Sequence, residues 1–186
     1  MSASNVTICN AALAMLGEQT IASLDEPTNR ARLCKDLYSQ ARQMLLRSHP
    51  WNCATKRVLL APLVDKPAFG YGNQFQLPDD FLRVQSVSAQ DYVIEGKKLL
   101  ASEPEIQLIY TYDNDNEASW DAMLIEGMSL LMAAKLTKAM TGSTTDADVR
   151  EAMLSQFLKR ARAVDGQEQP IQQIDPYNQG FMGVRY

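Results

Sequence analysis

Histidine is almost absent from this chain of 186 residues, with His49 as its single occurrence. A Ser-His-Asp or Cys-His catalytic site would have to use that residue. His49 precedes Pro50 at the end of a predicted helix, where a cation near the last carbonyl groups is the simpler interpretation. The sequence therefore offers little support for nucleophilic catalysis, and we expect a protein that is not an enzyme.

Cysteine is also scarce, with Cys9, Cys34 and Cys53 widely spaced along the chain. An odd number at such spacings does not predict a disulfide framework and fits a reducing compartment. Three scattered cysteines and one histidine lack the spacing of zinc ligands. Cys9 and Cys34 fall on apolar helical stripes, which indicates core packing. We expect no metal ion and no cofactor.

Motifs for calcium, nucleotides and paired carboxylates are incomplete. The run that begins at Asp113 has Ala118 where a calcium loop needs glycine. The turn at Gly70 lacks the last glycine of a dinucleotide loop and leads into a strand. Asp79 and Asp80 are adjacent, so their carboxylates should point to opposite sides rather than converge.

Long apolar runs and a leader sequence are missing as well. The most apolar stretch, residues 123–140, is interrupted by Glu126, Lys135 and Lys138, which makes it too polar for a membrane span. The N-terminus has neither the basic region nor the apolar core of a signal peptide. These features predict a cytosolic product without membrane contact.

Two kinds of periodicity divide the chain. Helical spacing predicts helices over residues 6–16, 27–47, 117–140 and 145–165, with Pro27 at the first position of the second. Short alternating segments bounded by proline and glycine predict strands over residues 52–60, 73–77, 82–87, 92–95, 98–101 and 107–112, with a hairpin at Gly96. The predicted fold class is α+β: a four-helix bundle (residues 1–50 and 117–165) with an inserted small antiparallel β-domain (residues 51–116) and an extended C-terminal arm (residues 166–186).

Individual positions are predicted within these elements. The buried stripe of the second helix should contain Ala31, Cys34, Tyr38, Ala41 and Leu45. One face of the last helix should contain Val149, Ala152, Met153, Gln156, Phe157, Arg160, Ala161 and Val164, and Thr145 with Asp148 forms a capping pattern at its start. Trp51 and Trp120 each open an element beside apolar neighbours, so both should be buried.

The predicted arm has no periodicity and is rich in Gln, Gly and Pro, yet it contains many large apolar residues. Scattered apolar groups on an extended segment are typical of docking on another surface. The alternative is a tail that packs on its own subunit. The residues predicted to dock on a partner or a neighbouring subunit are Ile171, Ile174, Tyr177, Phe181, Met182 and Tyr186.

Charge is distributed unevenly along the chain. The net charge is −4, whereas residues 27–47 contain five basic residues and one acidic residue. A nucleic-acid face on this helix is one interpretation. A solvated face or a contact with an acidic partner is the other, because no aromatic residues alternate with the charges as stacking platforms.

The order of several short motifs resembles a known family. His49-Pro50-Trp51-Asn52-Cys53-Ala54-Thr55-Lys56-Arg57 follows the second helix, and Leu77-Pro78-Asp79-Asp80-Phe81-Leu82-Arg83 lies in the β-rich region. Ile109-Tyr110-Thr111-Tyr112, Trp120 and Thr141-Gly142-Ser143 follow in that order. Over about residues 5–165 the chain resembles the tail tubular protein A family of head-to-tail connector (adaptor) proteins from tailed bacteriophages.

The resemblance implies a structural virion protein in the tail or neck, present in the host cytoplasm during assembly. Its implied partners are the portal protein, tail tubular protein B of the nozzle or another tail component, and further copies of itself in a ring, a dodecamer in this family. Double-stranded DNA would pass through the ring without specific binding during genome ejection. The family provides no catalytic residues.

Two other functions stay open at this level. One is a small DNA-binding protein that uses the basic helix 27–47. The other is a peptidoglycan-degrading tail protein, for which the sequence offers no pair of carboxylates at the required spacing.

Overall fold

The computed structural model describes residues 3–167, and this part of the chain contains four α-helices and six β-strands. The helices are α1 (Asn5–Met15), α2 (Asn29–Arg47), α3 (Ala122–Thr141) and α4 (Thr144–Gln167). The strands are β1 (Thr55–Leu60), β2 (Asn73–Gln76), β3 (Phe81–Val87), β4 (Val93–Glu95), β5 (Lys98–Ala101) and β6 (Ile106–Tyr112). Short 3₁₀ turns cover Asn52–Ala54 and Glu117–Ser119.

The described strands form two three-stranded antiparallel sheets. In the first, β6 lies between β1 and β3, with Arg57 opposite Ile109 and Val84 opposite Tyr110. In the second, β5 lies between β2 and β4. The predicted hairpin at Gly96 is confirmed, because β4 pairs with β5 and Gly96 has a φ of 59° that favours glycine.

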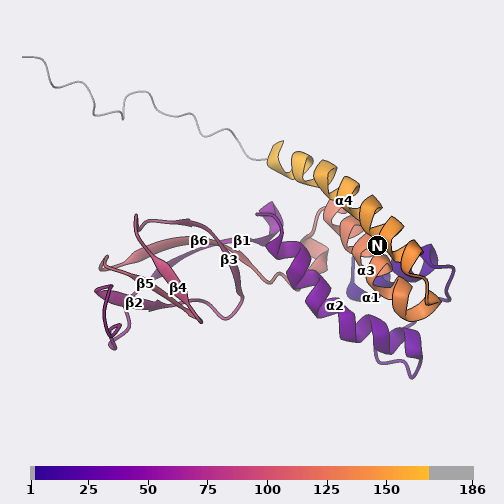
Figure 1. Ribbon diagram of the computed structural model, residues 1–186, viewed down its shortest axis with the longest axis horizontal. Coiled ribbons are helices and arrows are strands. Elements are labelled where there is room, and N and C mark those ends of the chain that lie inside the picture. Colours follow the sequence, from indigo (N-terminus) through magenta and orange to yellow (C-terminus); the bar gives the residue numbers. More distant parts are fainter. Residues whose placement is uncertain (1–2, 168–186) are drawn as a thin grey trace, which may run out of the picture.

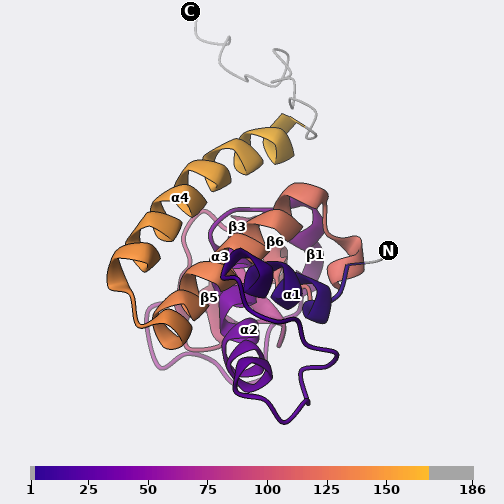
Figure 2. The ribbon, with the colours of Figure 1, turned by 90° about the vertical axis from the view of Figure 1, so that its right-hand side faces the viewer.

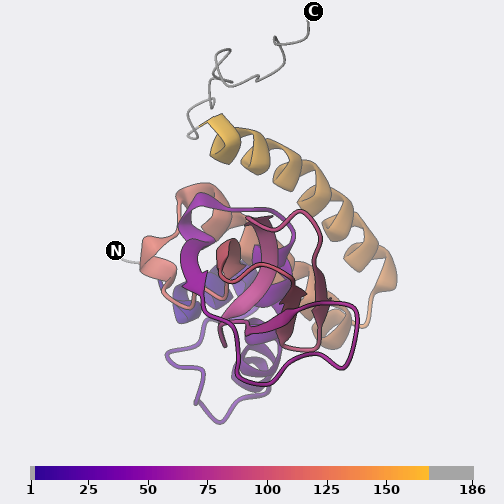
Figure 3. The ribbon, with the colours of Figure 1, turned by 90° about the vertical axis from the view of Figure 1, so that its left-hand side faces the viewer.

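The helices and the sheets occupy opposite ends of the molecule (Figure 1). Seen from the helical end, α4 arches along one side of the other helices, whereas the opposite view shows the two sheets in front (Figures 2 and 3). Each end has its own cluster of buried apolar side chains. We call these ends the helical part and the β part.

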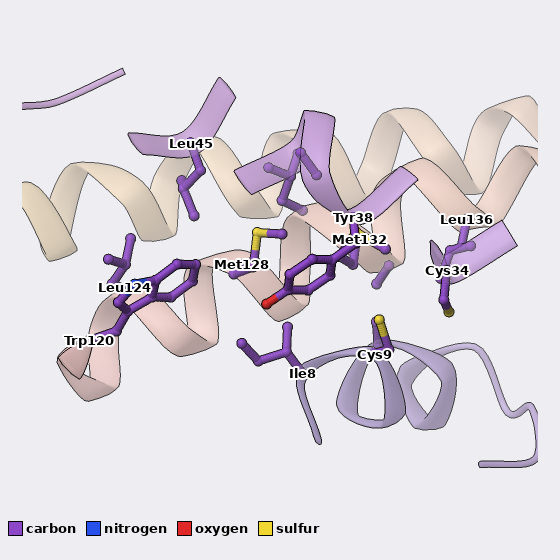
Figure 4. Close-up of a cluster of buried hydrophobic side chains, with 14 of the residues drawn as sticks. Ile8, Cys9, Cys34, Tyr38, Leu45, Trp120, Leu124, Met128, Met132 and Leu136 are labelled. Atoms are coloured by element: carbon purple, nitrogen blue, oxygen red, sulfur yellow. The ribbon is translucent and has the colours of Figure 1, made fainter. Parts of the chain in front are cut away.

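The helical core is built between α1, α2 and α3, with α4 packed on α3. Figure 4 shows Ile8, Tyr38 and Met128 from three helices in one cluster. All five residues predicted for the buried stripe of α2 are buried, which confirms that prediction. At Gly127 an added Cβ would lie 3.2 Å from Leu158 Cδ2, so the glycine allows α4 to approach α3 closely.

The helix starts differ from the predictions in detail. Ser4 caps α1 in a capping box with Thr7. Pro27 is not the first residue of α2, because Thr28 provides the side-chain cap and the helix begins at Asn29. The capping role predicted for Thr145 is wrong: Ser143 Oγ accepts the Asp146 N–H at 3.1 Å, which places the cap two residues earlier.

The α+β class with four helices and antiparallel β structure is confirmed for residues 3–167. The bundle arrangement of the helices and the division into separate domains stay predictions. Residues 168–186, which make up most of the predicted arm, lie outside the described residues. None of the described helices is long and apolar enough to cross a membrane.

Candidate functional site

The predicted docking residues all lie outside the described part of the chain. These residues are Ile171, Ile174, Tyr177, Phe181, Met182 and Tyr186. What the structure does describe is the point from which the arm starts, together with the surfaces that a partner or the arm itself can reach. The candidate site therefore consists of that starting point and the surfaces around it.

The end of α4 is fixed to the connection between α2 and β1 by a buried carboxylate. Asp165 is only 6% exposed. One carboxylate oxygen lies 3.1 Å from His49 Nε2, and the other accepts the Asn52 backbone N–H at 3.1 Å. One turn earlier, Arg162 donates to Ser48 Oγ at 3.1 Å. The arm thus starts beside residues 48–52, where the helical and β parts meet.

His49 is not the free helix-terminal cation that the sequence suggested. Burial lowers its pKa, and the opposing effect of Asp165 is not enough to reverse that shift, while Arg162 and Arg83 lower it further. At neutral pH the ring is therefore neutral and can donate from Nε2 to Asp165. Its edge contacts the Trp51 ring, with the centroids 4.7 Å apart. These contacts assign His49 a structural role.

A second set of polar contacts joins α2 to the segment that follows β6. Arg42 donates two hydrogen bonds to the Asp113 carboxylate, at 2.8 and 3.0 Å, and Gln43 donates a third at 2.8 Å. Burial acts to raise the pKa of Asp113, but the hydrogen bonds from Arg42 and Gln43 outweigh it and the pKa is lowered. Nearby, Tyr38 Oη donates to Glu117 at 2.9 Å. These contacts orient the β part on α2.

The side chains considered for chemistry do not converge within the described residues. Asp80 accepts hydrogen bonds from Lys56 and Tyr110, whereas the exposed Asp79 lies 3.8 Å from Lys97, which confirms that the two carboxylates point to different partners. Burial raises the pKa of Cys53 to about 12, which keeps its thiol protonated. Among residues 3–167, no group of three or more His, Cys, Asp or Glu side chains is placed to hold a metal ion.

The face predicted for α4 is covered only in part. Phe157 and Ala161 do pack inward, together with Leu154 and Leu158. Val149, Met153 and Val164 instead point to solvent and are 50%, 58% and 45% exposed. The sequence gives α4 apolar residues on two faces, and only packing on α3 decides which face is covered. The uncovered residues form an apolar stripe along the helix.

A further apolar surface lies at the far end of the β part. The connection between β1 and β2, residues 61–72, is drawn at the end away from the helices (Figure 1). Within it Val64 is 98% exposed and Phe69 is 88% exposed. Neither residue is among those predicted from the sequence. The sequence pattern that could have indicated them is the presence of large apolar residues in a segment rich in proline and glycine.

Two open grooves lie on the β part. One, of about 380 Å³, lies on the first sheet and includes Arg57, Leu59 and Ile109. The other, of about 500 Å³, runs between β3 and the β4–β5 hairpin. We call the second the β3 groove. Its lining residues are Arg47, Leu77, Pro78, Asp79, Phe81, Leu82, Arg83, Val84, Tyr92, Ile94, Gly96 and Lys97.

In a comparison with known proteins, no family model matches the chain and no curated protein matches it significantly.

Proposed function

We propose that this chain is a structural subunit of a tailed-bacteriophage particle, a head-to-tail adaptor that forms a ring between the portal and the tail. The observation that supports the proposal best is the presence of apolar side chains at separate places on the surface. Val64 and Phe69 occupy the tip of the β part, and Val149 and Met153 lie on α4 in the helical part. Apolar groups gathered on an exposed loop and along a helix are typical of interaction surfaces.

The position of these surfaces suits a subunit with several neighbours. A ring that closes needs contacts between two different faces of each subunit. The stripe on α4 offers one face to a neighbouring copy, while the tip of the β part and the arm are available to the components above and below. Neither of the two grooves described above is lined by a histidine or a cysteine, and we favour assembly over catalysis as the role of the two-part architecture.

The proposed passage of double-stranded DNA agrees with the charge of the molecule. A channel through which DNA passes should not bind it tightly. Each phosphate that a basic side chain neutralises adds salt-dependent affinity for DNA. The net charge of −4 suits such a surface. On the basic helix, Lys35 is paired with Asp25 at 2.7 Å and Arg42 with Asp113 at 2.8 Å, so two of the five cations already have carboxylate partners.

The test is assembly with the portal protein encoded in the same genome. The full chain and a chain that lacks residues 171–186 are each mixed with purified portal rings, and complexes are detected by pull-down and by electron microscopy. We expect the full chain to form a ring on the portal. The shortened chain should stay folded, with a cooperative melting curve, but fail to attach stably.

Two results would count against this proposal. Absence of any complex between the full chain and the portal would contradict the adaptor function. Unchanged attachment of the shortened chain would show that the arm does not dock on the portal.

A further inference from the structure

The β3 groove has one wall made by the open edge of a strand. Among residues 3–167, β3 pairs only with β6, so its other side has no neighbouring strand. Four consecutive residues, Phe81 to Val84, line the groove. Consecutive residues of a strand point to opposite faces, so a groove that touches all four runs along the strand edge. Such an edge can accept an added strand.

The floor of the groove is apolar and comes from the hairpin. Tyr92 and Ile94, two residues apart, line it from the β4 side. They are 37% and 40% exposed, so their side chains are only partly covered by the described residues. Alternate side chains of an added strand would pack on this floor. The register shifts in β3, next to Phe81 and next to Val84, limit the pairing to a few residues.

The rim of the groove is basic. Arg47 donates to the Leu82 carbonyl oxygen, and Arg83 Nη1 donates to the Arg47 carbonyl oxygen at 3.4 Å. Within residues 3–167 neither guanidinium forms an ion pair with a carboxylate, and Lys97 contributes a third positive charge near Asp79. An occupant with a carboxylate would complement this rim.

The starting point of the arm lies beside the same rim. Arg162 is bonded to Ser48, the residue after Arg47, and Asp165 contacts His49. The charge of Arg83 in the groove is close enough to His49 to act on its pKa. The 19 residues that follow Gln167 can span roughly 60 Å when extended. The arm of the same chain is therefore long enough to reach and line the groove.

The last ten residues of the chain match the groove in composition. Residues 177–186 contain no proline, so each can donate its N–H to a strand edge. Met182, Val184 and Tyr186 alternate with smaller or polar residues, which suits an apolar floor on one side. Asp175, two residues before this segment, can provide a carboxylate for the basic rim.

We propose that the β3 groove is a strand-acceptor site and that residues 177–186 of the same chain occupy it in the free subunit. A tethered segment has an effective concentration in the millimolar range, so even weak pairing favours the arm of the same chain over that of a second copy. The groove then holds the apolar end of the arm until a partner displaces it. The proposal goes beyond the adaptor function and does not depend on the portal.

The experiment is hydrogen exchange of the full chain, followed by mass spectrometry. Amides of residues 177–186 and of residues 81–84 should exchange on the order of tenfold more slowly than those of an unstructured peptide. Ile94→Ser and Arg83→Glu should each abolish the slow exchange of residues 177–186. The matched controls Leu59→Ser and Arg57→Glu, on the other groove, should leave it unchanged.

Each other outcome would overturn the proposal. Fast exchange of residues 177–186 in the unaltered chain would mean that the groove is empty. Slow exchange that persists in both groove variants, or that the controls also remove, would mean that the arm lies elsewhere. Slow exchange that disappears on dilution would identify the arm of a second copy as the occupant. Since no portal is present, failure here is distinguishable from failure of the adaptor function.

Discussion

Trp51 and Trp120 both lie in the helical core, and they differ in one contact. Trp51 is 0% exposed and its Nε1 donates to the Leu45 carbonyl oxygen at 3.1 Å. Trp120 is 5% exposed and its buried Nε1 has no acceptor among residues 3–167. The prediction that both are buried is confirmed. The two side chains should therefore contribute differently to stability, because only the Trp51 indole forms a hydrogen bond.

This difference predicts unequal costs for the same substitution. Trp51→Phe should lower the free energy of unfolding by about 1 kcal/mol more than Trp120→Phe, because only the first loses a hydrogen bond. Replacement of either by alanine should cost about 3–5 kcal/mol. Urea denaturation of the four variants measures these values. Equal costs for the two phenylalanine variants would mean that the Trp51 hydrogen bond contributes nothing.

A second residue-scale prediction concerns His49 and pH. Its pKa is lowered in the folded state, mainly by burial, in a site that also faces Asp165, Arg162 and Arg83. A lowered pKa means that the folded chain binds the proton less readily than the unfolded chain. The stabilisation is therefore present above the unfolded pKa of about 6.5 and is lost as the pH falls through the folded value.

The free energy of unfolding should therefore decrease as the pH falls from about 7 to about 5. His49→Gln, which can still donate to Asp165, should flatten this part of the profile. The comparison requires denaturation curves of both proteins across the range. A profile with the same slope in the variant would assign the pH dependence to other groups.

At the scale of elements, α4 has a covered face and an uncovered face. Leu154 is 7% exposed and packs in the helical core, whereas the adjacent Met153 is 58% exposed. Substitutions at these two adjacent residues can therefore distinguish an effect on stability, at Leu154, from an effect on assembly, at Met153. Under the proposed function, the uncovered face contacts a neighbouring copy.

Leu154→Ala should lower the free energy of unfolding by about 2–5 kcal/mol, since it leaves a cavity in the core. Met153→Ser should change it by less than about 0.5 kcal/mol, since the side chain is exposed. Thermal denaturation tests the stability of the two variants. Sedimentation of the assembled ring then tests whether the uncovered face of α4 contacts a neighbouring copy. If Met153→Ser leaves the ring unaffected, this part of α4 is not part of the contact between copies.

At the scale of the whole molecule, the balance of charge separates the adaptor from a DNA-binding regulator. We expect weak or absent binding of free double-stranded DNA at physiological salt, because the net charge is −4 and two cations of α2 are paired with carboxylates. A filter-binding or anisotropy titration at several salt concentrations measures this. Sub-micromolar affinity that falls steeply with salt would favour the regulator.

The charged contacts between the two ends matter at the same scale. Arg42, Gln43 and Asp113 join α2 to the chain after β6, and His49 and Asn52 join the β1 entry to Asp165 on α4. These contacts connect segments that are distant in sequence. They fix the direction in which the β part projects from the helices, and with it the direction of the tip that includes Phe69.

The sequence by itself determined the class of the fold and the type of most elements. Helical spacing in residues 31–45 and alternation with proline and glycine after Pro50 are local patterns, and local backbone preference together with one buried face is enough to specify them. The hairpin at Gly96 and the buried stripe of α2 followed from the same patterns. The exact caps at Thr28 and Ser143 did not, because several neighbouring polar residues were equally suitable.

Tertiary structure alone decided which surfaces stay uncovered. α4 has apolar residues on both sides, and packing on α3, with Leu158 next to Gly127, leaves Leu154 covered and Met153 exposed. The β3 groove forms only because β3 and the hairpin, which belong to different sheets, face each other. The pairing of His49 with Asp165 joins residues 116 positions apart. Such contacts depend on how finished elements pack, and short-range sequence patterns do not contain that information.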